Sequence, residues 1–234
     1  MSFKGQTVMI TGAAGNLGQA VSAAFAASGA NLALLDLNDA LLAKVPVAGA
    51  GDVLRQRVDL SDPASIAAAT SAAIARFGRI DALCNLAGGF QMGEKVHEIP
   101  ADKWNFMMEL NAGSVLRMSH EIVPHMLKAG GGRIVNIGAY SALSGKAEMG
   151  AYVASKSAVI RLTESMAAEL RSHNINVNCV LPSIIDTPQN RAAMPKADPG
   201  KWVAPEALAD VLMFLCSPAA RAIHGAAIPV VGLS

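Results

Sequence analysis

A tyrosine and a lysine lie at a spacing that lets them act together. Tyr152 and Lys156 are four residues apart, so on a helix they share one face and the ammonium can lie beside the phenol. A free tyrosine has a pKa of about 10, which is too high for easy proton exchange near neutral pH. A neighbouring positive charge favours the phenolate and lowers this pKa. The pair predicts general acid–base chemistry, with Tyr152 as the acid/base and Lys156 as the group that tunes it.

A Tyr–Lys pair that acts on a carbonyl usually needs a third hydrogen-bond donor, often a serine on a nearby loop. The segment before Tyr152, GAYSALSGKAEMGAYVASK over residues 138–156, offers Ser141 and Ser144. Ser144 is followed by a glycine, which is typical of a turn. Ser141 is the nearer candidate for the donor, and the alternative is that this donor is absent.

A glycine-rich segment near the amino terminus has the composition of a phosphate-binding turn. TGAAGNLG over residues 11–18 places glycines at 12, 15 and 18 between an expected strand and an expected helix. Glycines there permit a tight turn and a close approach of backbone to ligand, and the helix amino terminus offers free N–H groups to a pyrophosphate. In this context the segment predicts a dinucleotide site.

An acidic residue at the end of the second strand predicts which dinucleotide binds. Asp36 lies about 20 residues beyond the turn, where a carboxylate accepts hydrogen bonds from the adenosine ribose and repels a 2′-phosphate. No Arg or Lys occurs at residues 12–18 or 37–43 to attract that phosphate. We therefore expect NAD(H) in preference to NADP(H).

The elements that must position these residues alternate along the chain. Short apolar runs predict strands at 7–10, 31–36, within 52–60, 81–88, 133–138, 175–181 and 226–232. Longer Ala-rich stretches predict helices at 17–28, 61–78, 103–128, 151–171 and 205–216. Such alternation is typical of an α/β protein with a Rossmann-type, doubly wound parallel sheet of about seven strands and helices on both faces. Residues 1–234 are expected to form one domain, with an irregular substrate lid at about 183–203.

The bulk composition excludes several classes of function. The 234 residues are 52% hydrophobic and 16% charged, with a net charge of +1 and few aromatic residues, which gives no basis for binding nucleic acid or an acidic membrane. No apolar run reaches the length of about 20 residues that spans a bilayer. The three cysteines have no metal or redox spacing, the histidines show no ligand spacing, and a reducing, cytoplasmic location without a metal site is expected.

The ordered set of motifs resembles the short-chain dehydrogenase/reductase family over nearly the whole chain. It comprises TGAAGNLG, Asp36, Val58-Asp59-Leu60, Asn85-Leu86-Ala87-Gly88, Asn111, Tyr152-Ala-Ser-Lys156 and Pro182 through Thr187. The first turn departs from the commoner spacing G-x-x-x-G-x-G, because Asn16 occupies a usual glycine position. Asparagine tolerates left-handed backbone better than most residues, so we expect only a local change.

The resemblance implies hydride transfer between a nicotinamide and a small carbonyl or secondary alcohol, with Tyr152 as acid/base. It also implies that Lys156 binds the nicotinamide ribose, that Asn111 anchors a proton relay and that Thr187 holds the carboxamide. The positions implied for cofactor binding are Gly12, Gly15, Asn16, Leu17, Gly18, Asp36, Asp59, Leu60, Asn85, Ala87, Gly88, Tyr152, Lys156, Pro182, Ile185 and Thr187.

The family serine usually lies 13 residues before the tyrosine, and that position is Ala139 here. Either Ser141 replaces it or the substrate needs it less. Quinonoid dihydropteridine reductases also keep Tyr-x-x-x-Lys without the serine, and their loop is similar in style to residues 138–152. Two further alternatives are a non-catalytic NAD-binding regulatory protein and a sugar-nucleotide epimerase or dehydratase. The family also implies a homotetramer, or a homodimer, and a small-molecule substrate.

Overall fold

Seven parallel strands form one sheet in a computed structural model that describes residues 1–233. The strands are β1 (Thr7–Thr11), β2 (Asn31–Asp36), β3 (Val53–Arg57), β4 (Ala82–Asn85), β5 (Gly132–Ile137), β6 (Ile175–Pro182) and β7 (Ala227–Val230). Their order in the sheet is β3-β2-β1-β4-β5-β6-β7. The order reverses between β1 and β4, which is the hallmark of a doubly wound fold. The predicted fold class is confirmed.

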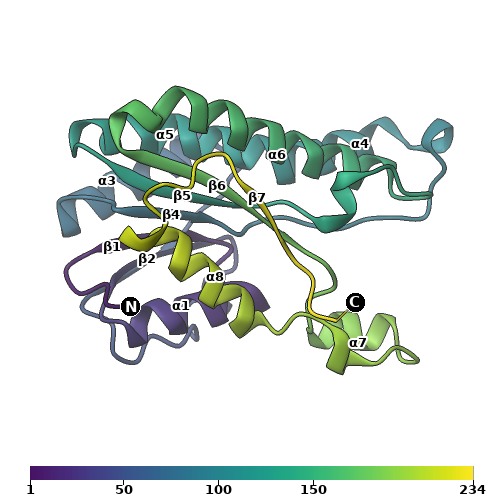
Figure 1. Cartoon of the computed structure of the whole chain (residues 1–234), viewed down its shortest axis with the longest axis horizontal. Coiled ribbons are helices and arrows are strands. Elements are labelled where there is room, and N and C mark those ends of the chain that lie inside the picture. Colours follow the sequence, from purple (N-terminus) through teal and green to yellow (C-terminus); the bar gives the residue numbers. More distant parts are fainter. Residues whose placement is uncertain (234) are drawn as a thin grey trace.

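Helices cover both faces of the sheet (Figure 1). They are α1 (Asn16–Ala27), α2 (Asp39–Leu42), α3 (Pro63–Phe77), α4 (Ala101–Met108), α5 (Ser114–Lys128), α6 (Gly150–Leu170), α7 (Pro188–Ala193) and α8 (Pro205–Cys216). Figure 1 shows α1 and α8 together below the sheet, and α3, α5 and α6 above it. Because side chains alternate along a strand, Val8 and Ile10 pack in the apolar cluster with α1 and α8, whereas Met9 packs in the cluster with α3 and α5.

Capping residues mark both ends of α3. The side chain of Asp62 accepts a hydrogen bond from the N–H of Ala64, and Pro63 occupies the first turn. Proline suits that position because its missing N–H has no partner inside the helix. Gly78 ends the helix with φ of 79°, a left-handed conformation that favours glycine.

Two predicted segments differ from the structure. The stretch predicted as one helix over 103–128 contains a π-helical turn, Glu109–Gly113, between α4 and α5. The stretch predicted as irregular over 183–203 contains α7 and a 3-10 turn, Pro199–Lys201. In α7 the hydroxyl of Thr187 accepts a hydrogen bond from the N–H of Asn190, and Pro188 follows, which is a regular helix start.

Within residues 1–233 no helix is both long and apolar enough to cross a bilayer. Over the same residues, no three His, Cys, Asp or Glu side chains gather as a metal site would require. The cysteines are buried and free, and the Sγ atoms of Cys84 and Cys216 lie 3.9 Å apart. The contact with the Cys216 thiol, together with burial, raises the pKa of Cys84, and burial raises the pKa of Cys179, so these thiols are poor nucleophiles.

Candidate active site

The predicted site residues gather at the edge of the sheet where the parallel strands end. The segments that follow β1, β4, β5 and β6 carry the glycine-rich turn, Gly88, Ala139 and the chain leading to α7. Ligands of doubly wound sheets bind outside the carboxyl ends of the strands, at the point where the strand order reverses. That point lies between β1 and β4 here.

The glycine-rich turn needs glycine at two positions for steric reasons. Gly12 has φ of 65°, and a Cβ there would lie 2.9 Å from the Cα of Ala87. A Cβ on Gly18 would lie 2.1 Å from the carbonyl oxygen of Gly12, a separation that no real structure tolerates. The turn therefore packs directly against the segment after β4, and the hydroxyl of Thr11 adds a 3.1 Å hydrogen bond from the N–H of Leu86.

The amino terminus of α1 is suited to an anion. Gly15 caps the helix without a side-chain hydrogen bond, and the first turn contains no acidic residue. The unpaired N–H groups and the positive end of the helix dipole remain for a ligand. A pyrophosphate fits these properties, and a dinucleotide would be held there by the backbone of the turn.

Asn16 does not use the left-handed backbone that the sequence suggested. It is the first residue of α1, and positive φ outside glycine occurs only at Glu148 and Asn174 among residues 1–233. Its side chain instead donates a 2.7 Å hydrogen bond from Nδ2 to Oε1 of Gln189 in α7. The usual glycine position thus links the phosphate turn to the helix in the expected lid.

Asp36 is held by the backbone on both sides. Its Oδ2 accepts a 3.0 Å hydrogen bond from the N–H of Ala14, and its Oδ1 accepts one of 2.9 Å from the N–H of Asn38. These contacts fix the carboxylate at the end of β2 beside the glycine-rich turn. Each oxygen keeps acceptor capacity for a hydroxyl group, as a ribose would require.

The π-helical turn places Asn111 in the interior. Oδ1 of Asn111 accepts a 3.0 Å hydrogen bond from the N–H of Gly89, and Nδ2 donates to the carbonyl of Gly89 at 3.1 Å. Nδ2 also donates to Oγ of Ser155 at 2.9 Å, and that hydroxyl donates to the carbonyl of Tyr152 at 2.8 Å. Asn111 therefore joins the loop after β4 to the first turn of α6.

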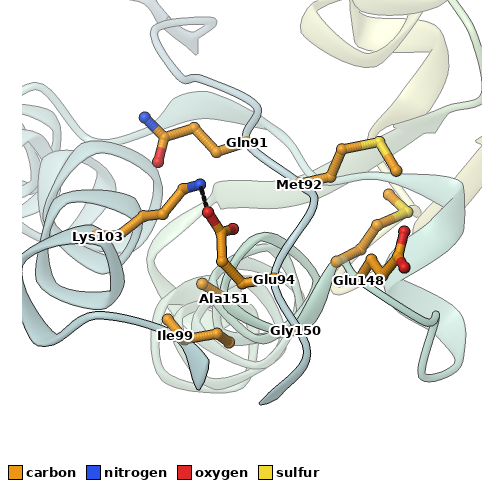
Figure 2. A pocket seen from close by; sticks show the side chains of 9 residues that line it. Gln91, Met92, Glu94, Ile99, Lys103, Glu148, Gly150 and Ala151 are labelled. Atoms are coloured by element: carbon orange, nitrogen blue, oxygen red, sulfur yellow. Dashed lines mark hydrogen bonds and ion pairs between the residues drawn. The ribbon is translucent and has the colours of Figure 1, made fainter. Parts of the chain in front are cut away.

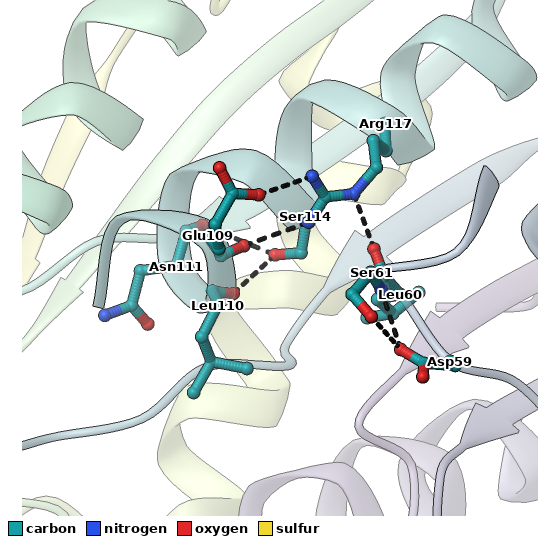
Figure 3. Close-up of polar contacts among 8 residues, drawn as sticks. All are labelled: Asp59, Leu60, Ser61, Glu109, Leu110, Asn111, Ser114 and Arg117. Atoms are coloured by element: carbon teal, nitrogen blue, oxygen red, sulfur yellow. Dashed lines mark hydrogen bonds and ion pairs between the residues drawn. The ribbon is translucent and has the colours of Figure 1, made fainter. Parts of the chain in front are cut away.

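Arg117 fastens the same π-helical turn to the loop after β3 (Figure 3). Its Nη1 donates to Oε2 of Glu109 at 2.6 Å, and its Nε donates to the carbonyl of Leu60 at 2.6 Å. In that loop, Oδ1 of Asp59 accepts hydrogen bonds from the N–H and hydroxyl of Ser61, and these bonds lower the pKa of Asp59. The contacts of Asp59 in the structure are thus those of a turn-forming residue.

Lys156 is buried beside Gly88. A Cβ on Gly88 would lie 2.7 Å from Oδ1 of Asn111 and 3.0 Å from Nζ of Lys156, so both polar groups border the space that glycine leaves free. Nζ donates a 2.8 Å hydrogen bond to the carbonyl of Ile137 at the end of β5. Burial lowers the pKa of Lys156 to about 8, because the charged form loses its hydration.

The pKa of Tyr152 differs from the sequence-based expectation. Burial raises it to about 12, whereas the neighbouring lysine was expected to lower it. The ammonium of Lys156 is engaged with the carbonyl of Ile137, so desolvation of the phenolate prevails. The ring of Tyr152 packs edge-on against Phe90, with 4.8 Å between the centroids, and Phe90 extends outward with 54% of its surface exposed.

The position of the family serine is apolar in the structure as well. Ala139 follows β5, is 3% exposed, and belongs to an apolar cluster that also packs against Tyr152. Ser141 lies in a 3-10 turn, Tyr140–Leu143, and its hydroxyl forms no hydrogen bond within residues 1–233. The structure therefore does not bond Ser141 to Tyr152.

The other predicted cofactor positions fall into two groups. Ala87 and Gly88 line the turn after β4, and Thr187, Ile185 and Pro182 lie where β6 leads into α7. Asn85 is buried, and its Nδ2 donates to Oδ1 of Asn136 in β5 at 2.8 Å. Leu17 packs against the core cluster under α1, and Leu60 presents its carbonyl to Arg117.

A small hollow opens beside the first turn of α6 (Figure 2). An ion pair between Glu94 and Lys103 crosses it, and Met149 and Ala151 form part of its wall. Its volume is about 10 Å³, room for about one water molecule. Glu148 at its rim has φ of 60°, an uncommon conformation for a glutamate.

Sequence reasoning missed three residues that position the site: Ser155, Arg117 and Gln189. Ser155 lies inside the motif Tyr152-Ala-Ser-Lys156, three residues after the tyrosine, and that spacing could have indicated a contact with the first turn of the helix. Arg117 and Gln189 act across long sequence separations, which no local pattern reveals.

Comparisons with known proteins agree with this geometry. Residues 6–198 match the family described as short chain dehydrogenase. The chain is 32% identical to a D-threitol dehydrogenase of Mycolicibacterium smegmatis over 97% of this chain and 92% of that protein. A short-chain type dehydrogenase/reductase from Mycobacterium ulcerans superposes with a TM-score of 0.93 at 26% identity, covering 100% of this chain and 90% of the other. An NAD⁺-bound xylitol dehydrogenase superposes with a TM-score of 0.91 at 25% identity, covering 99% and 100%.

Proposed function

This chain belongs to the short-chain dehydrogenase/reductase family, and from that premise we propose that it transfers hydride between NAD(H) and a small carbonyl or secondary alcohol. Membership makes it an oxidoreductase that uses a nicotinamide cofactor. The choice of NAD(H), the acid/base role of Tyr152 and the substrate class are our proposal. The observation that carries it is the convergence of Asn111 and Lys156 on the space beside Gly88.

In this mechanism the bound nicotinamide supplies or accepts the hydride, and the residues of this chain manage the proton. Tyr152 donates its phenolic proton to the developing alkoxide when a carbonyl is reduced, and it accepts that proton when an alcohol is oxidised. Its raised pKa keeps the phenol protonated in the free protein, which suits the acid role. Lys156 binds the ribose, and its positive charge on the same helix face stabilises the phenolate that forms.

Asn111 holds the geometry and connects the proton path. Its side chain fixes Gly89 and, through Ser155, the carbonyl of Tyr152. We propose that the same amide orients a water beside Lys156 through which the proton returns to solvent. Replacing Tyr152 by Phe removes the proton donor without changing the ring packing, so turnover is expected to fall by at least about 100-fold. Full turnover of the Tyr152→Phe variant would remove Tyr152 from the mechanism.

The choice of NAD(H) rests on Asp36 and on the absence of Arg or Lys at residues 12–18 and 37–43. The carboxylate is fixed by Ala14 and Asn38 at the end of β2, and a 2′-phosphate placed there would be repelled. Titration of the protein with NADH and with NADPH, followed by nicotinamide fluorescence, tests this without a substrate. Tighter NADH binding supports the proposal, and the reverse preference contradicts it. In an Asp36→Ala variant the two affinities should approach each other.

The substrate is proposed to be small and weakly charged. Phe90 packs against the ring of Tyr152, and the cluster that contains Ala139 and packs against Tyr152 is apolar. Arg191 is paired with Asp186 at 2.6 Å rather than free for an anion. Two of the similar proteins, the D-threitol dehydrogenase and the xylitol dehydrogenase, are named for small polyols. A panel of sugar alcohols and the matching ketoses, assayed for NADH formation or loss, is the direct test.

A second candidate is reduction of a quinonoid dihydropterin with NADH. The observation that favours it is the apolar Ala139 at the serine position, since such a substrate needs less help from an oxyanion donor. Adding a quinonoid dihydropterin to the same panel separates the candidates. Turnover of polyols but not of the pterin supports the first.

We propose further that the chain assembles as a homotetramer or homodimer in a reducing, cytoplasmic compartment. Trp104 and Phe106 on α4 and Leu116 on α5 are 41–58% exposed, and exposed large apolar side chains are suited to burial in a subunit interface. Residues 1–234 would act as one domain, with 183–203 closing over the substrate. Light scattering after size-exclusion chromatography tests the assembly, and a monomeric mass would contradict it.

A further inference from the structure

A second pocket lies at the opposite edge of the sheet, where the strands begin. It has a volume of about 390 Å³ and is lined by residues that precede β1, β4, β5 and β6. Its size falls in the range of small-molecule sites. A strand of five residues is about 17 Å long, so the length of β1 separates this pocket from the proposed active site.

The charges in this pocket are strongly unbalanced. Lys4, Arg79 and Arg133 line it, and Asp81 is the acidic residue among the lining residues. The carboxylate of Asp81 is already in use, because Oδ1 accepts from Nε of Arg79 at 2.6 Å and Oδ2 accepts from the N–H of Thr7 at 2.8 Å. Two positive charges therefore remain uncompensated, although the whole chain has a net charge of +1.

Arg133 is the informative member of this set. Its guanidinium is partly buried, and burial lowers its pKa. Nη1 donates to the carbonyls of Gly132 and Asn174 at 2.8 and 3.1 Å, and within residues 1–233 no carboxylate pairs with it. A partly desolvated arginine without an anion is costly, and its planar fork matches the oxygens of phosphates and carboxylates.

We propose that this pocket binds a small ligand with two or more clustered anionic oxygens, either phosphate or carboxylate groups. Arg133 contacts the anion at the floor of the pocket, while Lys4 and the free Nη atoms of Arg79 reach it from the rim. The site is independent of the proposed dehydrogenase reaction, because no residue that lines it belongs to the candidate active site.

Isothermal titration calorimetry with tripolyphosphate and with citrate, in the presence of excess NADH, tests the site. NADH is included because a phosphate probe could otherwise bind the glycine-rich turn. We expect saturable binding to the wild-type protein and a loss of about tenfold or more in affinity for Arg133→Gln. Tighter binding of tripolyphosphate identifies a phosphate ligand, and tighter binding of citrate identifies a polycarboxylate.

Two further variants keep the test decisive if Arg133→Gln folds poorly. Lys4→Gln, at an exposed position, should weaken binding by about two- to fivefold. Arg161→Gln is the matched control, since Arg161 is 70% exposed on α6 and lies outside the pocket, and its affinity should equal that of the wild type. Absence of binding, loss of binding when NADH is added, or equal affinity in Lys4→Gln and wild type would overturn the proposal.

Discussion

Placing a serine at the end of β5 tests whether the carbonyl-binding donor is truly absent. Ala139 is 3% exposed in an extended backbone conformation and shares an apolar cluster with Tyr152. The substitution Ala139→Ser adds one hydroxyl at the position where the family usually carries it. Ser141, two residues further on, is the competing donor.

The substitution is expected to change two quantities, kcat and the stability of the fold. One preorganised donor to a developing oxyanion lowers the barrier by about 2.7–4 kcal/mol, so kcat for an unactivated ketone should rise by about 100- to 1,000-fold. In the free protein the new hydroxyl is buried among apolar groups and costs about 1–3 kcal/mol of stability when unpaired. For a chain of this size that cost lowers the melting temperature by about 2 to 12 °C.

The assay is steady-state oxidation of NADH with the best ketone from the substrate panel, together with thermal unfolding. Ala142→Ser is the matched control, because Ala142 is also buried and lies in the adjacent 3-10 turn; it should lower stability without raising kcat. If Ala139→Ser leaves kcat unchanged while Ser141→Ala lowers it about 100-fold, Ser141 is the working donor and the reasoning from Ala139 is refuted.

Three further results are expected. Burial lowers the pKa of Lys156 from 10.5 to about 8, so between pH 8 and 10 the unfolded chain binds more protons and the free energy of unfolding should rise with pH. Burial raises the pKa of Tyr152 from 10.0 to about 12, so above pH 10 this tyrosine ionises in the unfolded chain first and the free energy of unfolding should fall. Urea titrations at several pH values across this range measure the free energy of unfolding. Its rise, roughly 3 kcal/mol at most, should vanish in the Lys156→Met variant. Either Asn16→Gly or Gln189→Ala should speed NADH association in stopped-flow fluorescence, because each removes the bond that ties α7 to the phosphate turn; unchanged rates in both would show that this bond does not gate entry. Gly18→Ala forces a 2.1 Å contact and should destabilise the protein by more than about 3 kcal/mol in thermal unfolding.

Sequence patterns predicted the sheet and the cofactor turn well because both depend on local rules. Apolar runs and helix-capping residues determine strands and helix ends within a few residues, as at β2 and α8, whose bounds match the prediction. The glycines at 12 and 18 are required by contacts that any such turn makes. These features need no knowledge of distant parts of the chain.

The electrostatic state of the site could not be predicted in the same way. The spacing of Tyr152 and Lys156 places them on one helix face, but the pKa of each depends on burial and on the carbonyl of Ile137, which comes from another strand. The π-helical turn was missed because one extra residue in a turn leaves no mark in composition. The helix α7 was missed because a six-residue segment carries too little periodicity.

The π-helical turn at Glu109–Gly113 also sets the rotational phase between α4 and α5. Each residue of a regular helix advances by about 100°, so the extra residue of a π-turn lets the two helices face different neighbours while the backbone continues. Lys103 on α4 can then reach Glu94 while Asn111 points toward Gly89. Deleting one residue within this turn would rotate α4 by about a quarter of a turn relative to α5 and break both contacts at once. The number of residues in this short segment, and not only their identity, therefore positions both contacts.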